Sequence, residues 1–174
     1  MIVKDNNLKI MKLFFENPEK KFHIREAARL TGLSAPGVLK IIGRLKKEGL
    51  LNSEKGKVVE NVFATKTEKF IQLKRCYNIL SLFDSGLVEV LREEYEEPEA
   101  IVLFGSYSEG SDIFKSDIDI AVVTEKKSKL DLKRFERVLK RKINIYEIQI
   151  GGCDKEFLNA LANGILLYGY LKVL

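Results

Sequence analysis

The chain has 174 residues, of which 45% are hydrophobic and 32% are charged, and its formal net charge is +5. This composition is ordinary for a soluble globular protein of one domain or two small ones. No run of residues approaches the ~18 consecutive apolar positions of a membrane span, and the charged N-terminus MIVKDNNLKIMK argues against a signal peptide.

Charge divides the chain into two parts. Residues 1–66 carry 14 Lys and Arg against 7 Asp and Glu, a net charge of +7, whereas residues 67–174 carry 16 against 18, a net charge of −2. A basic module joined to a slightly acidic one predicts that the first module binds a polyanion. Cys76 and Cys153 are isolated and lack metal-ligand spacing, which indicates reduced thiols in a cytoplasmic protein.

Three helices and a hairpin are predicted in the basic module. The first helix covers residues 7–15, the second covers 24–30, and the third begins after the capping residue Ser34 and ends at Gly49. Their predicted buried side chains are Leu8, Met11, Phe14, Phe15, Ile24, Ala27, Ala28, Leu30, Val38, Ile42 and Leu45. Leu50-Leu51, a turn at 54–57 and a strand at 58–64 predict a β-hairpin.

The stretch FHIREAARLTGLSAPGVLKIIGRLKKEGLL resembles winged helix-turn-helix domains of the MarR/ArsR-like kind. This resemblance implies a DNA-binding domain over residues 1–66, with the third helix in the major groove of duplex DNA. We assign Ser34, Ala35 and Gly37 to the groove, Lys40 and Arg44 to base edges or phosphate, and Lys55 and Lys57 on the wing to the adjacent backbone. The alternative is a winged domain that is used only for protein contacts. The single histidine, His23, is interpreted as a capping or surface residue.

Residues 67–85 are predicted to form a linker helix. Phe70, Leu73, Tyr77 and Leu80 are spaced as an apolar stripe, and Asp84-Ser85-Gly86 ends it. The stripe over residues 67–83 predicts either packing on the first module or pairing with a second copy in a homodimer.

The segment IVLFGSYSEGSDIFKSDIDIAVV, residues 101–123, holds the main chemical signal. It predicts two buried strands, with Gly105-Ser106 after the first and Asp117 and Asp119 at the start of the second. Two carboxylates two residues apart on a strand point to one face and can share a divalent cation. Gly105 permits close approach of phosphate and Ser106 offers donors, so the pattern predicts phosphoryl chemistry. An EF-hand is excluded, because Ala121 and Val122 occupy positions where a ligand and a glycine are required.

This segment resembles the minimal nucleotidyltransferases of the polymerase-beta-like superfamily, and the resemblance covers residues 86–174. It implies an α/β fold with a mixed sheet flanked by helices. It also implies two Mg²⁺ ions on Asp117 and Asp119, ATP or another NTP on Gly105-Ser106, and a third carboxylate on a later strand that activates an acceptor hydroxyl. Some members of this family are antitoxins that adenylylate a tyrosine of a HEPN-type toxin, which implies such a partner here.

The third acid is the weak point of the pattern. The strand predicted at 142–148 carries Asn144 at the acid position, and an amide can coordinate a metal but cannot accept a proton. Glu147 is the nearest acid and falls on the opposite face unless a bulge rotates it. Helices are further predicted at 87–95, 130–142 and 157–167.

The leading interpretation is therefore a DNA-binding protein with a nucleotidyltransferase domain that modifies a hydroxyl of a partner protein. A transcription regulator with a weakened, nucleotide-sensing transferase domain is the alternative, and a small-molecule transferase is a third.

Overall fold

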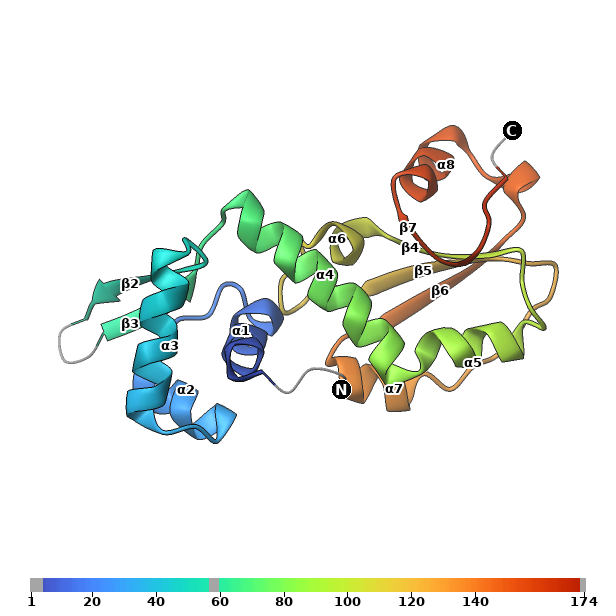
Figure 1. The fold of residues 1–174 in the computed structure, drawn as a ribbon. Coiled ribbons are helices and arrows are strands. Elements are labelled where there is room, and N and C mark those ends of the chain that lie inside the picture. Colours follow the sequence, from blue (N-terminus) through green and yellow to red (C-terminus); the bar gives the residue numbers. More distant parts are fainter. Residues whose placement is uncertain (1–4, 57–59, 173–174) are drawn as a thin grey trace. The chain divides into compact units, whose positions relative to one another are not determined.

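A computed structural model describes residues 5–56 and 60–172 of the chain. The chain forms two compact units, residues 1–74 and 75–174, and the boundary falls inside helix α4 (Glu68–Ser85). Figure 1 shows the elements of both units. In the described part of the chain, every helix is too short or too polar to cross a membrane.

The first unit contains three helices and a three-stranded antiparallel sheet. The helices are α1 (Asn6–Glu16), α2 (Ile24–Thr31) and α3 (Ala35–Lys47). The strands are β1 (Phe22–His23), β2 (Leu51–Lys55) and β3 (Glu60–Ala64), in the order β1-β3-β2. The three predicted helices and the hairpin are thus present, although Lys57 and Val58 at its turn lie outside the described residues. The short strand β1 was not predicted.

Local capping explains where these helices begin and end. The Asp5 carboxylate accepts a hydrogen bond from the Asn7 amide at 2.7 Å, and the Ser34 hydroxyl accepts one from the Gly37 amide at 3.3 Å. Gly32 ends α2 in the left-handed conformation, with φ +68°. The inner face of α1 differs from the prediction. Ile10 is fully buried and Leu8 is only half-buried, because Ile10 lies one turn before Phe14.

The second unit is built on a four-stranded mixed sheet, as the sequence predicts. Its strands are β4 (Ala100–Phe104), β5 (Ile118–Val123), β6 (Ile143–Ile148) and β7 (Ile165–Gly169), in the order β6-β5-β4-β7. β4 pairs antiparallel with both β5 and β7, whereas β5 and β6 are parallel. The adjacent ends of β4 and β5 therefore hold the predicted chemical residues.

Helices cover both faces of this sheet (Figure 1). α5 (Leu87–Glu94) and α7 (Lys133–Leu139) pack with Ile118, Ile120 and Val122 of β5 in one core. α8 (Lys155–Ala162) packs with Ala121 and Val123 in the other core. The short α6 (Gly105–Glu109) follows β4, and a 3₁₀ turn, η1 (Ile150–Gly152), follows β6. Because strand side chains alternate, Asp117 and Asp119 lie on the α8 face.

Two predicted helices in this unit differ from the structure. The helix predicted at 157–167 is wrong beyond Ala162, because residues 165–169 form strand β7. A Cβ at Gly164 would lie 2.6 Å from the Leu103 carbonyl oxygen, so the chain turns tightly against β4 there and then pairs with it. The helix predicted at 130–142 covers only Lys133–Leu139.

The buried stripe of α4 also differs from the prediction. Its buried residues are Phe70, Lys74, Asn78 and Leu82. Leu73, which the apolar spacing places on the inner face, is 40% exposed. The observed stripe includes a lysine and an asparagine, and a pattern that counts only apolar residues misses both of them.

Candidate functional site

The ends of β4 and β5 bring a glycine against a carboxylate. Phe104 of β4 pairs with Asp119 of β5, so Gly105 comes directly after the paired position. Gly105 has φ +71°, a left-handed conformation that favours glycine. A Cβ at Gly105 would lie 3.1 Å from Asp119 Oδ2. Glycine is therefore favoured here both by the backbone conformation and by the space beside the carboxylate.

Asn144 lies between the two aspartates. The parallel register of β5 and β6 pairs Asp119 with Asn144. Asn144 Nδ2 donates to Asp119 Oδ1 at 2.9 Å and makes a longer hydrogen bond to Asp117 Oδ2 at 3.4 Å. One amide thus offsets part of the repulsion between two half-buried carboxylates. The residue beside the two aspartates is therefore an asparagine, whereas the family resemblance implies a third acid at this position.

An aromatic group borders the aspartates on the same face. The ring of Phe104 lies 5.3 Å from that of Tyr146 and 5.3 Å from that of Phe157, between ring centroids. The Tyr146 hydroxyl donates to Asp119 Oδ1 at 3.4 Å. Burial, the charge of Asp119 and this hydrogen bond raise the pKa of the Tyr146 hydroxyl, which therefore stays protonated at neutral pH. Tyr146 was not predicted as a site residue, although its position two residues after Asn144 on a strand places both side chains on one face.

Glu147 does not join this site. The register of β5 and β6 runs without a shift, so the bulge that would rotate Glu147 is absent between these described strands. Its carboxylate accepts from the Tyr95 hydroxyl at 2.8 Å and from the Ser128 amide at 2.7 Å, and it pairs with Lys127 at 3.4 Å. Burial opposes ionisation, but these three partners outweigh it and lower the pKa of Glu147. Glu147 therefore ties the loop after β5 to the end of α5.

A buried polar network supports the glycine-serine turn. Asn78 Nδ2 donates to the Tyr107 carbonyl oxygen at 2.9 Å and to Asp112 Oδ1 at 2.8 Å. Asp112 Oδ2 lies 3.5 Å from a guanidinium nitrogen of Arg141. All three polar side chains are buried, and they join α4, the loop after α6 and the start of β6. This network was not predicted from the sequence, because its members are far apart in the chain.

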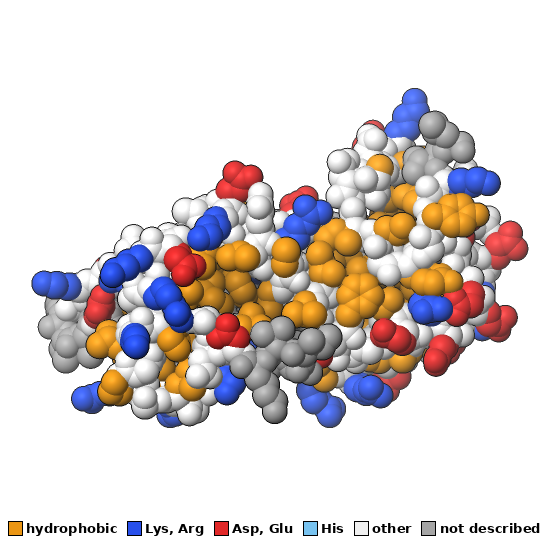
Figure 2. Space-filling view, in the orientation of Figure 1, with side chains coloured by type: hydrophobic (Ala, Val, Ile, Leu, Met, Phe, Trp, Pro, Cys, Tyr) orange, Lys and Arg blue, Asp and Glu red, His pale blue; other side chains and the backbone are white. Residues whose placement is uncertain are grey.

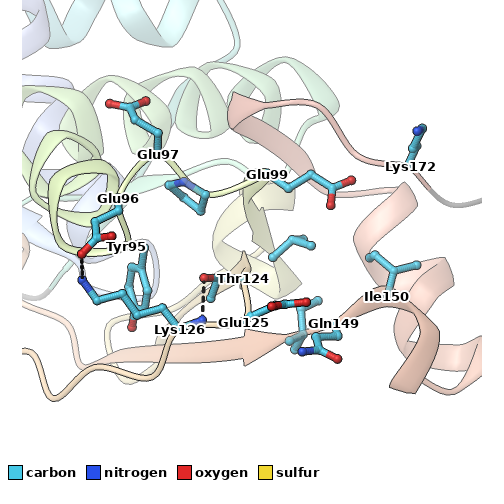
Figure 3. Close-up of a pocket in the computed structure, with 13 residues that line it drawn as sticks. Tyr95, Glu96, Glu97, Glu99, Thr124, Glu125, Lys126, Gln149, Ile150 and Lys172 are labelled. Atoms are coloured by element: carbon cyan, nitrogen blue, oxygen red, sulfur yellow. Dashed lines mark hydrogen bonds and ion pairs between the residues drawn. The ribbon is translucent and has the colours of Figure 1, made fainter.

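A hollow at the other end of the sheet is separate from the aspartates. It has a volume of about 630 Å³ and opens where Thr124 and Glu125 follow β5, as Figure 3 shows. Lys126 Nζ donates there to Glu96 Oε1 at 2.8 Å. Asp117 precedes the same strand, which places this hollow roughly 20 Å away along β5. It is therefore no part of the candidate site.

The predicted DNA-contacting residues lie on one helix and one strand of the first unit. Ser34 caps α3, Ala35 and Gly37 are half-buried in its first turn, and Lys40 and Lys55 are exposed. Arg44 is exposed and donates a hydrogen bond to the side chain of Asn7. Lys57 lies outside the described residues. Figure 2 shows basic side chains along the surface formed by α3.

Few side chains near Asp117 and Asp119 could serve as metal ligands. In the described ranges 5–56 and 60–172, no group of three or more His, Cys, Asp or Glu side chains is placed to hold a metal ion. Mg²⁺ in proteins is commonly bound by one or two carboxylates together with substrate phosphates and water. The carboxylates of Asp117 and Asp119 offer oxygen ligands that fit this requirement, whereas Asn144 turns its amide nitrogen toward them.

Residues 87–170 match the model of the family described as Polymerase beta, Nucleotidyltransferase. This part of the chain is a nucleotidyltransferase-type domain. A comparison with curated proteins finds no match to the chain.

Two solved structures share a limited likeness with the chain. One is a single-residue mutant of Lactococcus lactis ZitR, with 14% identity and a TM-score of 0.40 over 50% of this chain and 60% of that one. The other is a toxin-antitoxin with AMP-PNP, with 25% identity and a TM-score of 0.38 over 48% of this chain and 71% of that one. At these TM-scores, neither likeness supports an inference about function.

Proposed function

We propose that the second unit binds ATP or another NTP with Mg²⁺ and transfers a nucleotidyl group to a hydroxyl of a partner protein. The observation that carries this proposal is the pairing of β4 with β5, which sets Gly105 against Asp119. Asp117 lies two residues earlier on the same face of the sheet. A phosphate can approach a glycine backbone closely, and two carboxylates beside it can share a cation with that phosphate.

Asp117 and Asp119 would hold Mg²⁺, with two ions expected in the presence of the nucleotide. A rotation of the Asn144 amide would add its carbonyl oxygen to the ligands, since the two ends of an amide are nearly equal in shape. Bound Mg²⁺ would neutralise triphosphate charge and polarise the α-phosphate. In the described chain, the Ser106 hydroxyl makes no hydrogen bond, which leaves it able to donate to a phosphate oxygen.

In the proposed reaction, the acceptor oxygen attacks the α-phosphorus, the bond to pyrophosphate breaks, and the proton of the acceptor hydroxyl passes to solvent. Asn144 cannot accept the proton of the attacking hydroxyl. The chain therefore contributes mainly by positioning the reactants and by stabilising charge. The resemblance to antitoxin-type nucleotidyltransferases suggests a tyrosine of a HEPN-type toxin as the acceptor.

Incubation with α-labelled ATP and Mg²⁺ tests this proposal. The full chain is incubated alone and with the protein encoded by the neighbouring gene, and label on either protein is measured after denaturing electrophoresis. We expect label on the partner, and its loss in Asp117→Asn and Asp119→Asn. Equal labelling by the wild type and both variants would rule out the assignment of the aspartates.

Asn144 favours a second candidate function, a regulator that senses the nucleotide without transferring it. If a missing base limits the chemistry, Asn144→Asp should raise transfer by roughly 10²–10⁴-fold, the range typical of a positioned general base. Wild-type protein that binds Mg-ATP but labels no acceptor, with Asn144→Asp equally inactive, would favour the sensor.

We also propose that residues 1–66 bind duplex DNA as a winged helix-turn-helix domain. The exposed cations Lys40 and Arg44 on α3 and Lys55 on β2 support this proposal. Lys40→Ala and Lys55→Ala should weaken binding and flatten the slope of log affinity against log salt by about one unit for each phosphate interaction that the variant removes. Lys9→Ala on α1 is the matched control. Undetectable duplex binding, or binding that does not depend on salt, would contradict this proposal and leave the unit as a protein-contact module.

A further inference from the structure

A basic cleft opens beside Asp117. It has a volume of about 650 Å³ and lies between α7 and the loop at 114–116. Two acidic side chains, Asp117 and Glu136, line it together with six basic ones, which are Lys115, Lys133, Arg137, Lys140, Arg141 and Lys142. The second unit as a whole carries 14 Lys and Arg against 17 Asp and Glu, a net charge of −3. Positive charge is therefore concentrated in this cleft against the balance of its own unit.

Most of these cations are not neutralised by the protein. Arg141 is neutralised, since it is 6% exposed and pairs with Asp112 at 3.5 Å. Glu136, one of the two acidic residues that line the cleft, accepts a hydrogen bond from the Ile143 amide at 3.2 Å. Four basic side chains are exposed and form no ion pair with any described carboxylate: Lys115, Lys133, Arg137 and Lys142. An anion of matching size would replace water around these four charges.

The position of the cleft suits binding of the acceptor better than binding of the nucleotide. Asp117 belongs both to the cleft and to the candidate site, whereas Gly105, Ser106 and Asp119 do not line it. An occupant would therefore approach Asp117 from a side other than the glycine-serine turn. An in-line displacement needs the attacking oxygen opposite the leaving pyrophosphate, so this is a suitable entry for an acceptor.

We propose that the cleft binds an acidic segment of the partner protein and brings that segment's hydroxyl to Asp117. This inference rests on the proposed function, whose acceptor it describes. The cations would hold carboxylates that flank the hydroxyl. Phe114 is 52% exposed at the wall of the cleft, with its ring centroid 5.3 Å from the Arg141 guanidinium, and offers an apolar surface to a tyrosine ring.

Charge outside the cleft favours a short protein segment over a nucleic-acid strand. Outside the cleft, the second unit carries 8 Lys and Arg against 15 Asp and Glu, a net charge of −7, and Figure 2 shows acidic side chains gathered over the end of α5. A strand that extends beyond the cleft would be repelled by the net negative unit. A short acidic segment meets only the cleft.

Fluorescence anisotropy on the full chain without nucleotide tests the inference separately from catalysis. The probe is a fluorescein-labelled peptide, Glu-Glu-Gly-Tyr-Gly-Glu-Glu, and its counterpart with Gln in place of Glu carries the same dye. We expect Lys133→Gln/Arg137→Gln to weaken binding of the acidic peptide by about tenfold, since the variant removes two exposed cations that would pair with peptide carboxylates. Lys129→Gln/Arg134→Gln removes equal charge from exposed positions outside the cleft and should keep wild-type binding.

Three results would overturn the inference. One is equal loss of peptide binding in the cleft variant and in the control variant. Another is equal binding of the Glu and Gln peptides. The third is tighter binding of a single-stranded hexauridylate than of the acidic peptide, lost in the same cleft variant, which would assign the cleft to nucleic acid. If Lys133→Gln/Arg137→Gln fails to fold by circular dichroism, Lys115→Gln/Lys142→Gln replaces it. Absence of Mg-ATP binding by the wild type would count against the proposed function alone.

Discussion

At the scale of single residues, Gly105 links the backbone to the candidate metal site. Gly105→Ala should lower the free energy of unfolding by about 1–2 kcal/mol, because a left-handed conformation is unfavourable for alanine. Its Cβ would also press on Asp119, so we expect weaker Mg-ATP binding. Gly86→Ala is the matched control, since Gly86 has φ +77° with no atom within 4 Å of an added Cβ. Urea unfolding and calorimetry measure both effects. Equal Mg-ATP affinity in the two variants would contradict the contact with Asp119.

Glu147 predicts a pH dependence of stability rather than of catalysis. Its pKa in the folded protein is lowered, so its ionised form stabilises the fold at pH values above the pKa of the unfolded state. That stabilisation is lost as the pH falls through the folded pKa. Glu147→Gln should therefore reduce the free energy of unfolding by about 1–2 kcal/mol at neutral pH and by less in acid.

Urea unfolding of Glu147→Gln at neutral and at acidic pH measures this difference. Glu89→Gln, at an exposed position of α5, is the control. A loss of stability that is the same at both pH values would mean that the charge of Glu147 is not involved.

The motif Gly105-Ser106 to Asp119 could be located from the sequence, because a strand pattern and two fixed spacings are local features. Asn144 was also visible as an asparagine at a position where the family resemblance implies an acid. The hydrogen bonds of Asn144 to both aspartates could not be predicted, because they depend on the register between β5 and β6. The partners of Glu147 likewise come from distant segments, with Tyr95 52 residues away.

At the scale of elements, α4 shows how a polar residue can determine packing. Asn78 is buried and bonds both Tyr107 and Asp112. Asn78→Ala would leave a buried carbonyl and a buried carboxylate oxygen each short of one donor, which should cost about 1–3 kcal/mol of stability. Cys76→Ala, at an exposed position of the same helix, should change stability by less than ~0.5 kcal/mol. Thermal and urea unfolding test the pair, and similar losses in both variants would show that the network contributes little.

The segment near the end of the chain shows where the prediction of helices and strands from the sequence fails. Apolar spacing predicts a helix through Leu167, yet residues 165–169 add a strand to the edge of the sheet. A run such as Ile165-Leu166-Leu167-Tyr168 fits either element, and the free edge of β4 decides between them. Helices with a local end signal, such as Gly32 at the end of α2 and Ser34 at the start of α3, were predicted because these signals lie in the adjacent sequence.

At the scale of the whole molecule, the chain combines a basic unit with an acidic unit that has a nucleotidyltransferase-type domain. Net charge is +8 over residues 1–74 and −3 over residues 75–174. The positive charge of the first unit agrees with the proposed binding of DNA by that unit. A homodimer through residues 67–83 remains our proposal, and Leu73 is exposed enough to contribute to it. A DNA site for that dimer would contain two half-sites related by two-fold symmetry.

We propose that Asp117 and Asp119 form a nucleotide site with the Gly105-Ser106 turn. Isothermal titration of ATP into the full chain tests it most directly, in Mg²⁺ and in EDTA, with wild type, Asp117→Asn and Asp119→Asn. We expect the wild type to bind ATP only in Mg²⁺ and each variant to lose that binding, because Asn replaces a charged ligand with a neutral one. Wild-type affinity in both variants, or binding that persists in EDTA, would contradict the claim.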